Sequence, residues 1–144
     1  MMDLKRARQL LACIALESDD PDTQTACFAV APNGGLLLSA SNQLPPRVER
    51  KPERLMRPAK YQFIEHAEKN LAYSAARLGV SLEGCTLYLN WFPCRSCVMA
   101  ILSMGITALV ADRAAYEARK DDPRYEFAEA VTLLAEANVE VRWL

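Results

Sequence analysis

Histidine is nearly absent from this sequence, which has one such residue, His66, among 144. Any metal site built with an imidazole therefore has a single candidate. An excess of either charge is also missing, because 17 lysines and arginines face 18 aspartates and glutamates, for a net charge of −1. Such a chain has no general attraction to a polyanion. A long nucleic acid is therefore not an expected partner.

Long apolar runs are missing as well. No stretch approaches the roughly 18 apolar residues of a membrane-spanning helix. The nearest feature is the run from Leu10 to Leu16, which follows the basic residues Lys5, Arg6 and Arg8 and mimics a short signal peptide. The run is minimal in length and acidic residues follow it from Glu17. We therefore expect an amphipathic first helix and no membrane association.

Cysteine occurs five times, and this odd number suits a reducing cytoplasm better than a disulfide framework. We therefore expect a cytoplasmic protein. The shares of 51% hydrophobic and 24% charged residues, in a chain of 144 residues, argue against disorder. The length is that of one ordinary domain, so residues 1–144 are expected to form a single unit.

Helical and strand-like segments alternate along the chain. The turn residues from Pro32 to Gly35 separate two apolar runs and favour an antiparallel hairpin. The rest of the alternation predicts an α/β fold, with a mainly parallel sheet covered on both faces and the hairpin at one edge. The expected helices are 3–17, 63–78, 94–104 and 124–137, and the expected strands are 23–31, 36–41, 85–90, 106–111 and 139–143.

Two short motifs contain three potential metal ligands and one carboxylate. His66-Ala67-Glu68 is followed later by Pro93-Cys94-Arg95-Ser96-Cys97. The two cysteines are three positions apart, so on a helix both sulfurs can reach one ion. Pro93 suits a helix start, where the helix dipole favours a Cys94 thiolate. A two-residue offset on a regular helix separates side chains by about 200°. His66 is therefore expected at or before the first turn of its helix.

The combination of ligands predicts a catalytic metal site. Three protein ligands leave the fourth tetrahedral position of zinc to water, whose pKa falls to roughly 7 on the metal. Glu68 can then accept the proton, transfer it to a ring nitrogen of the substrate and protonate a departing amine. The pattern H-x-E followed by P-C-x-x-C is the signature of zinc-dependent nucleobase deaminases.

A structural zinc module is the alternative. It would recruit Cys13, Cys27 or Cys85 as a fourth ligand and leave Glu68 without a role. Cys27 and Cys85 lie in strand-like apolar runs and Cys13 lies on the stripe of the first helix. All three are therefore interpreted as small core residues.

The chain resembles the cytidine deaminase-like superfamily and, within it, the deoxycytidylate (dCMP) deaminases. Asp20-Pro21-Asp22-Thr23-Gln24 is similar to that family's D-P-x-T-Q turn. The similarity continues through Asn42, Pro45 and Arg47 and through the segments 65–70, 86–88 and 93–97.

The resemblance implies a three-layer α/β/α sandwich around a five-stranded mixed sheet. It also implies Zn2+ on His66, Cys94 and Cys97, catalysis by Glu68, and conversion of dCMP to dUMP and ammonia. Relatives of this kind are commonly dimers or hexamers, so a homo-oligomer is expected.

The resemblance also suggests substrate contacts. Asn42 is similar to an asparagine that contacts the sugar of the nucleotide, and the base is expected to meet backbone groups near Ala67 and just before Pro93. We also interpret the rings of Trp91 and Phe92 as a wall of the pocket.

Two departures from the family pattern concern the substrate. The family's G-Y-N-G is Ala40-Ser41-Asn42-Gln43, and its T-Q-x-G-A is Thr23-Gln24-Thr25-Ala26-Cys27. These changes affect the pocket around sugar and phosphate. The alternative is therefore a deaminase of another small aminated heterocycle, including a free base or nucleoside.

Positive charge is concentrated between Arg47 and Lys60, where six basic residues face two acidic ones. This segment lies between Asn42 and His66, so it could close over the pocket and hold a 5′-phosphate, with Arg47 as a contact. The alternative is a solvated loop. The polar stretch from Glu117 to Arg124 is expected to be a solvated loop or a helix start.

Overall fold

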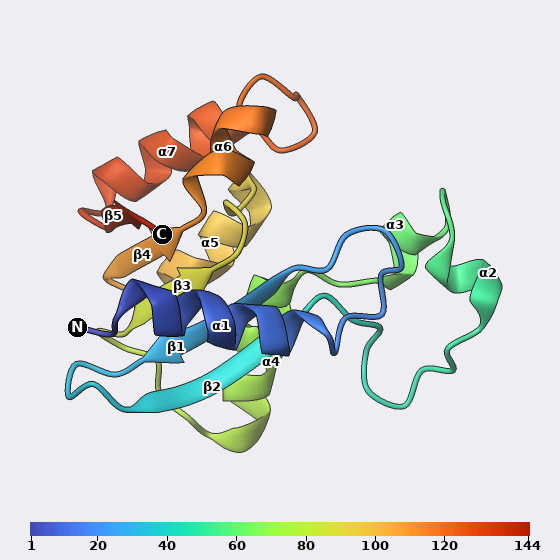
Figure 1. Ribbon diagram of the computed structural model, residues 1–144, viewed down its shortest axis with the longest axis horizontal. Coiled ribbons are helices and arrows are strands. Elements are labelled where there is room, and N and C mark those ends of the chain that lie inside the picture. The colour runs from blue at the N-terminus through green and yellow to red at the C-terminus, as the bar shows by residue number, and fades with distance from the viewer.

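A five-stranded mixed sheet is the centre of the fold (Figure 1). The computed structural model describes all 144 residues, and the strand order is β2-β1-β3-β4-β5. β1 is antiparallel to both β2 and β3, whereas β3, β4 and β5 pair in parallel, so only β1 runs against the other four. The strands are β1 (Ala26–Val30), β2 (Leu36–Ser41), β3 (Thr86–Leu89), β4 (Ala108–Ala111) and β5 (Glu140–Trp143).

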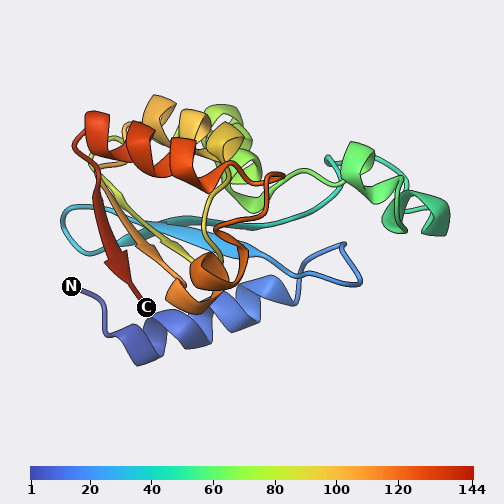
Figure 2. The same cartoon turned by 90° about the horizontal axis from the view of Figure 1, so that it is seen from above.

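Helices cover both faces of the sheet, which confirms the three-layer α/β/α sandwich (Figure 2). One face carries α4 (Ala67–Leu78), α5 (Arg95–Ser103) and α7 (Phe127–Glu136), and the other carries α1 (Leu4–Ala15) with α6 (Arg113–Arg119) at its end. None of these helices has the length and apolar character required to cross a bilayer.

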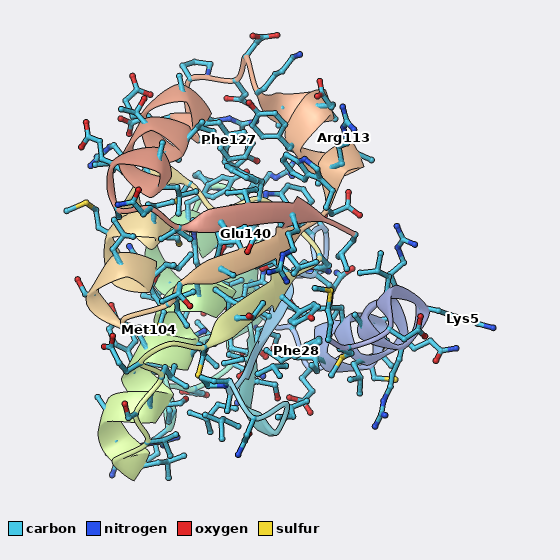
Figure 3. All side chains as sticks on the ribbon, turned by 90° about the vertical axis from the view of Figure 1, so that its left-hand side faces the viewer. Lys5, Phe28, Met104, Arg113, Phe127 and Glu140 are labelled. Carbon is cyan, nitrogen blue, oxygen red and sulfur yellow. The ribbon has the colours of Figure 1, made fainter.

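The central strands β1, β3 and β4 are mostly apolar on both sides because helices cover both faces of the sheet there. Successive residues of β1 alternate between two cores: Cys27 and Ala29 contribute to the core beneath α4, α5 and α7, and Phe28 contributes to the core beneath α1. The Phe28 ring stacks on Tyr88 of β3, with ring centroids 4.8 Å apart. Figure 3 shows Phe28 and Phe127 on opposite sides of the sheet.

Turn residues end these elements as the sequence predicts. Gly34 in the β1–β2 hairpin has φ +89°, and the Ala31 N–H donates to the Gly35 carbonyl at 2.8 Å. Gly79 has φ 68° and ends α4 in the left-handed conformation. Both positions favour glycine, which has no Cβ to clash there.

The predicted helix 63–78 is wrong at its start. A separate short helix, α3 (Lys60–Phe63), precedes α4, and Ile64 between them is extended with φ −88° and ψ 117°. The cause is a tertiary contact, because the backbone of Glu65 exchanges two hydrogen bonds with Gln43, at 2.9 and 3.1 Å. The chain therefore leaves the helical conformation before His66.

Two further helices were not predicted. α2 (Pro52–Leu55) lies in the basic segment from Arg47 to Lys60, where no helix was expected. It projects together with α3 from one end of the sheet in both views (Figures 1 and 2). α6 ends within the stretch from Glu117 to Arg124, which was expected to be a solvated loop or a helix start. Its N-terminal signal is Asp112, whose side chain accepts a hydrogen bond from the Ala115 N–H at 2.7 Å.

Candidate active site

Two helix N-termini supply the potential metal ligands. His66 is the N-cap residue of α4, with φ −67° and ψ 150°, and Cys94 is the N-cap residue of α5, with φ −67° and ψ 164°. These extended conformations free the two side chains from the directions that a regular helix imposes. Cys97 follows within the first turn of α5 and is fully buried. His66 therefore has the cap position that its spacing from Glu68 requires.

The three side chains converge. The Nδ1 atom of His66 lies 3.3 Å from the sulfur of Cys97 and 3.7 Å from the sulfur of Cys94. A nitrogen and a sulfur bound to one tetrahedral zinc ion at the usual bond lengths lie about 3.6 Å apart. His66, Cys94 and Cys97 are thus positioned to hold one metal ion, and their nitrogen and sulfur donors suit zinc.

The charges of these side chains are coupled. A side-chain hydrogen bond with Cys97 lowers the pKa of the Cys94 thiol to about 4, and the same contact raises the pKa of Cys97. The hydrogen bond with Cys94 raises the pKa of His66. The site thus favours a thiolate at Cys94, which is the form that binds metal.

Glu68 lies beside this cluster but is not one of its ligands. Its side chain is only 5% exposed. Burial raises the pKa of the Glu68 carboxyl toward neutral pH. A carboxyl group with a raised pKa can both accept and return a proton.

One cavity of about 370 Å³ contains these groups. Its volume is within the range of small-molecule sites. His66, Glu68 and Cys94 form part of its wall, and Trp91 contributes from the chain between β3 and α5. The remaining wall comes from the segment around Asp20, the end of β2, the α2–α3 segment and the residues 119–125.

The other cysteines lie outside the ligand cluster. Cys27 and Cys85 are buried in the core, as predicted, and burial raises the pKa of the Cys27 thiol. Cys13 is exposed on α1, so its interpretation as a core residue is wrong. The three-ligand group has no fourth protein member, which disfavours a closed structural zinc module.

Asn42 lines the cavity, but its amide is mostly engaged within the protein. The Oδ1 atom accepts hydrogen bonds from the Ser18 hydroxyl and from the Thr25 N–H at 2.9 Å, and Nδ2 donates to the Thr23 carbonyl at 2.8 Å. A carboxamide has two acceptor and two donor positions. Only one N–H of Asn42 is therefore left for a substrate.

Three other predicted contact residues differ in how far they reach the cavity. Phe92 is 1% exposed and its ring packs against Phe127 and Tyr116, so the ring is part of the core and only the backbone remains for a base. Ala67 is buried in the core too, which limits it to its backbone N–H. Arg47 is exposed in a turn with φ 68° and is not part of the cavity wall.

Lys60, from the basic segment expected to close over the pocket, lines the cavity but is engaged within the protein. It is 3% exposed, and its ammonium group contacts Asp20 at 2.8 Å and Asp22 at 3.0 Å. Two other cavity residues were missed by the sequence analysis. Arg119 and Arg124 reach the wall from the region expected to be solvated. The signal that could have found α6 is the capping residue Asp112 before a run of helix-forming residues.

The fold and site together define a class of protein. A cluster of one imidazole and two cysteine sulfurs next to a buried carboxyl group, where two helices begin at one end of the sheet of an α/β/α sandwich, is typical of zinc-dependent hydrolases that deaminate nucleobases. The chain belongs to the family described as "Cytidine and deoxycytidylate deaminase zinc-binding region", which matches residues 2–112. It is thus a zinc-binding deaminase.

Individual relatives agree with this assignment. An uncharacterized deaminase in the luxG 3′ region of Aliivibrio fischeri is 27% identical over 144 residues, covering 97% of this chain and 92% of the relative. A probable deoxycytidylate deaminase of Drosophila melanogaster is 28% identical, covering 83% of this chain and 61% of the relative. The crystal structure of a dCMP deaminase from cyanophage S-TIM5 with dCMP and dUMP has a TM-score of 0.74 at 20% identity, with both chains fully covered.

Proposed function

We propose that this protein hydrolyses the exocyclic amine of a cytosine-type nucleotide, with dCMP as the leading substrate and dUMP and ammonia as products. The observation that carries the proposal is the position of Glu68, which is buried in the wall of the same cavity as His66 and Cys94. The Drosophila relative, whose name states deoxycytidylate deaminase, supports the choice of substrate.

The metal-binding residues and Glu68 have separate roles in the proposed reaction. His66, Cys94 and Cys97 would hold the zinc ion, which supplies the Lewis acidity that makes water a nucleophile near neutral pH. Glu68 accepts the proton of the attacking water and passes it to a nitrogen of the ring. It then assists protonation of the leaving amine, so that one water is consumed and one ammonia is released.

Backbone groups position the ring in this proposal. Ala67 is the first residue of α4, and the N–H groups in the first turn of a helix have no partner within it. The Ala67 N–H is therefore a donor for a ring carbonyl oxygen. The backbone of Phe92, which lines the cavity, is the second contact.

A second candidate is deamination of another small aminated heterocycle, as a free base or nucleoside. The internal hydrogen bonds of Asn42 favour a free base in particular, because they leave only one N–H of its amide for a sugar. A cavity of about 370 Å³ also accepts several kinds of ring.

A substrate panel tests both candidates. Zinc-loaded protein is assayed for ammonia release from cytosine, cytidine, deoxycytidine, CMP, dCMP, adenine and guanine. We expect the highest kcat/KM for dCMP. Higher efficiency with a free base or nucleoside would support the second candidate, and no release from any cytosine compound would contradict the proposal.

We also propose that the protein forms a homo-oligomer, either a dimer or a hexamer. The projecting α2–α3 segment exposes apolar side chains that a second copy could cover, including Met56 and Tyr61, which are 62% and 61% exposed. Light scattering coupled to size exclusion should give a mass that is a multiple of the 16.1 kDa chain. A monomeric mass at micromolar concentration would contradict this.

A further inference from the structure

Four basic side chains line the active-site cavity. They are Arg57 and Lys60 from the α2–α3 segment, and Arg119 and Arg124 from the end of α6 and the loop that follows it. They differ in whether an acidic side chain already neutralises them. That difference decides which one is available to an anionic group of a substrate.

Two of the four are already paired closely with acidic side chains. The Lys60 ammonium donates to both carboxylate oxygens of Asp20 and to Asp22, which uses its three hydrogens. The guanidinium of Arg124 binds Asp122 through Nε at 3.0 Å and through Nη2 at 2.6 Å. Lys60 therefore has no donor left, whereas the charge of Arg124 is neutralised by Asp122, although its side chain is 69% exposed and keeps other N–H donors.

Arg57 is only loosely paired, because its Nε lies 3.6 Å from a carboxylate oxygen of Asp22, beyond ordinary hydrogen-bond length. Its side chain is 61% exposed. Arg57 therefore keeps its donors but lacks a fixed position.

Arg119 stacks on an aromatic ring and forms no salt bridge, although its charge contributes at longer range to the lowered pKa of Asp122. Its guanidinium carbon lies 4.0 Å from the centroid of the Trp91 ring. Trp91 is itself anchored, because its carbonyl accepts a hydrogen bond from the Asp112 N–H at 3.2 Å and its ring meets Tyr125 edge-on at 6.5 Å. Stacking uses the face of a guanidinium and leaves its in-plane N–H donors free.

We propose that Arg119 determines specificity by binding the phosphate of a nucleoside monophosphate. The inference rests on the proposed function, because Arg119 and Trp91 line the same cavity as Glu68 and His66. A guanidinium fixed in one plane can form two parallel hydrogen bonds to a phosphate, and the stacking has already ordered the side chain. The phosphate-binding charge thus comes from α6 and not from Arg47.

The test uses product binding, which does not depend on turnover. Calorimetry compares dUMP with deoxyuridine on the zinc-loaded wild type and on Arg119→Ala. The matched control is Arg113→Ala, which also removes an arginine side chain. Arg113 is the first residue of α6, is exposed and is not among the residues of the cavity wall. Ammonia release from dCMP and deoxycytidine is measured on the same three proteins.

We expect the wild type and Arg113→Ala to bind dUMP more tightly than deoxyuridine. Arg119→Ala should weaken dUMP binding by about 10- to 100-fold, as for the loss of a hydrogen-bonded charge, and leave deoxyuridine unchanged. Equal binding of both ligands by the wild type, or unchanged dUMP binding by Arg119→Ala, would overturn the inference. Equal ammonia release from dCMP and deoxycytidine would overturn the inference about Arg119 but would leave the deaminase proposal intact. Absence of ammonia release from both would contradict the deaminase proposal itself.

Discussion

The Nδ1 atom of His66 lies 3.3 Å from the sulfur of Cys97, although the two residues are 31 positions apart in the chain. The contact joins the start of α4 to the first turn of α5. Both helices pack on the same face of the sheet, so the packing of the core brings the ligands together.

Removal of one ligand should remove the metal. Cys97→Ala leaves one nitrogen and one sulfur donor, so we expect zinc content to fall from about one ion per chain to near zero after dialysis. Cys13→Ser, on the exposed side of α1, is the control and should retain the ion. Elemental analysis measures both. Loss of zinc from Cys27→Ser as well would favour the four-ligand structural module.

Glu68→Ala should keep zinc and lose activity. Because proton transfer from water and to the substrate both pass through this carboxylate in the proposal, we expect kcat to fall by about 1000-fold or more. Zinc content and the thermal unfolding profile establish that the variant is intact. A turnover close to that of the wild type would contradict the assigned role.

Asn42→Ala should destabilise the fold. The substitution removes the acceptor of the Thr25 N–H and the donor to the Thr23 carbonyl, and the Ser18 hydroxyl keeps only the backbone carbonyl of residue 42 as its acceptor. We expect a loss of about 2–4 kcal/mol in the free energy of unfolding, measured with urea. Gln9→Ala, at an exposed position of α1, should change it little. Unchanged stability with a raised KM would instead indicate that Asn42 serves the sugar.

Lys60→Met should destabilise the protein near neutral pH, because it leaves Asp20 buried without its cation. We expect a loss of about 3 kcal/mol. Lys120→Met is the matched control, since its ammonium pairs with Glu117 at the surface, and should have no measurable effect.

The stability of the wild type and that of Lys60→Met should depend differently on pH in acid. The hydrogen bond from Lys60 lowers the pKa of Asp22 below its usual value of about 4, so the unfolded state binds more protons there. This contribution to stability is present above about pH 4 and is lost as the pH falls through the lowered pKa. The wild type should therefore lose stability more steeply than Lys60→Met below pH 4. Parallel acid profiles would contradict this reading of the Asp22 contact.

Regular elements were predicted well where periodicity and turn residues agreed. The strand 36–41 has the predicted bounds, and α1, α5 and β4 differ from prediction by a few residues. The signals are local, since hydrophobic period and glycine position do not depend on the rest of the chain. The break before α4 was not predictable in this way, because the pairing of Glu65 with Gln43 causes it.

The amino-acid sequence by itself determined the metal-binding set, because a single histidine and one C-x-x-C pair left few other combinations. It also determined the deaminase family through those motifs. Only the tertiary structure decided which cations face the substrate cavity. In the folded protein Lys60 pairs with Asp20, Arg47 lies outside the cavity wall, and Arg119 stacks on Trp91. The reason is physical: ligand chemistry depends on residue type and spacing, whereas the availability of a charge depends on partners that are distant in the chain.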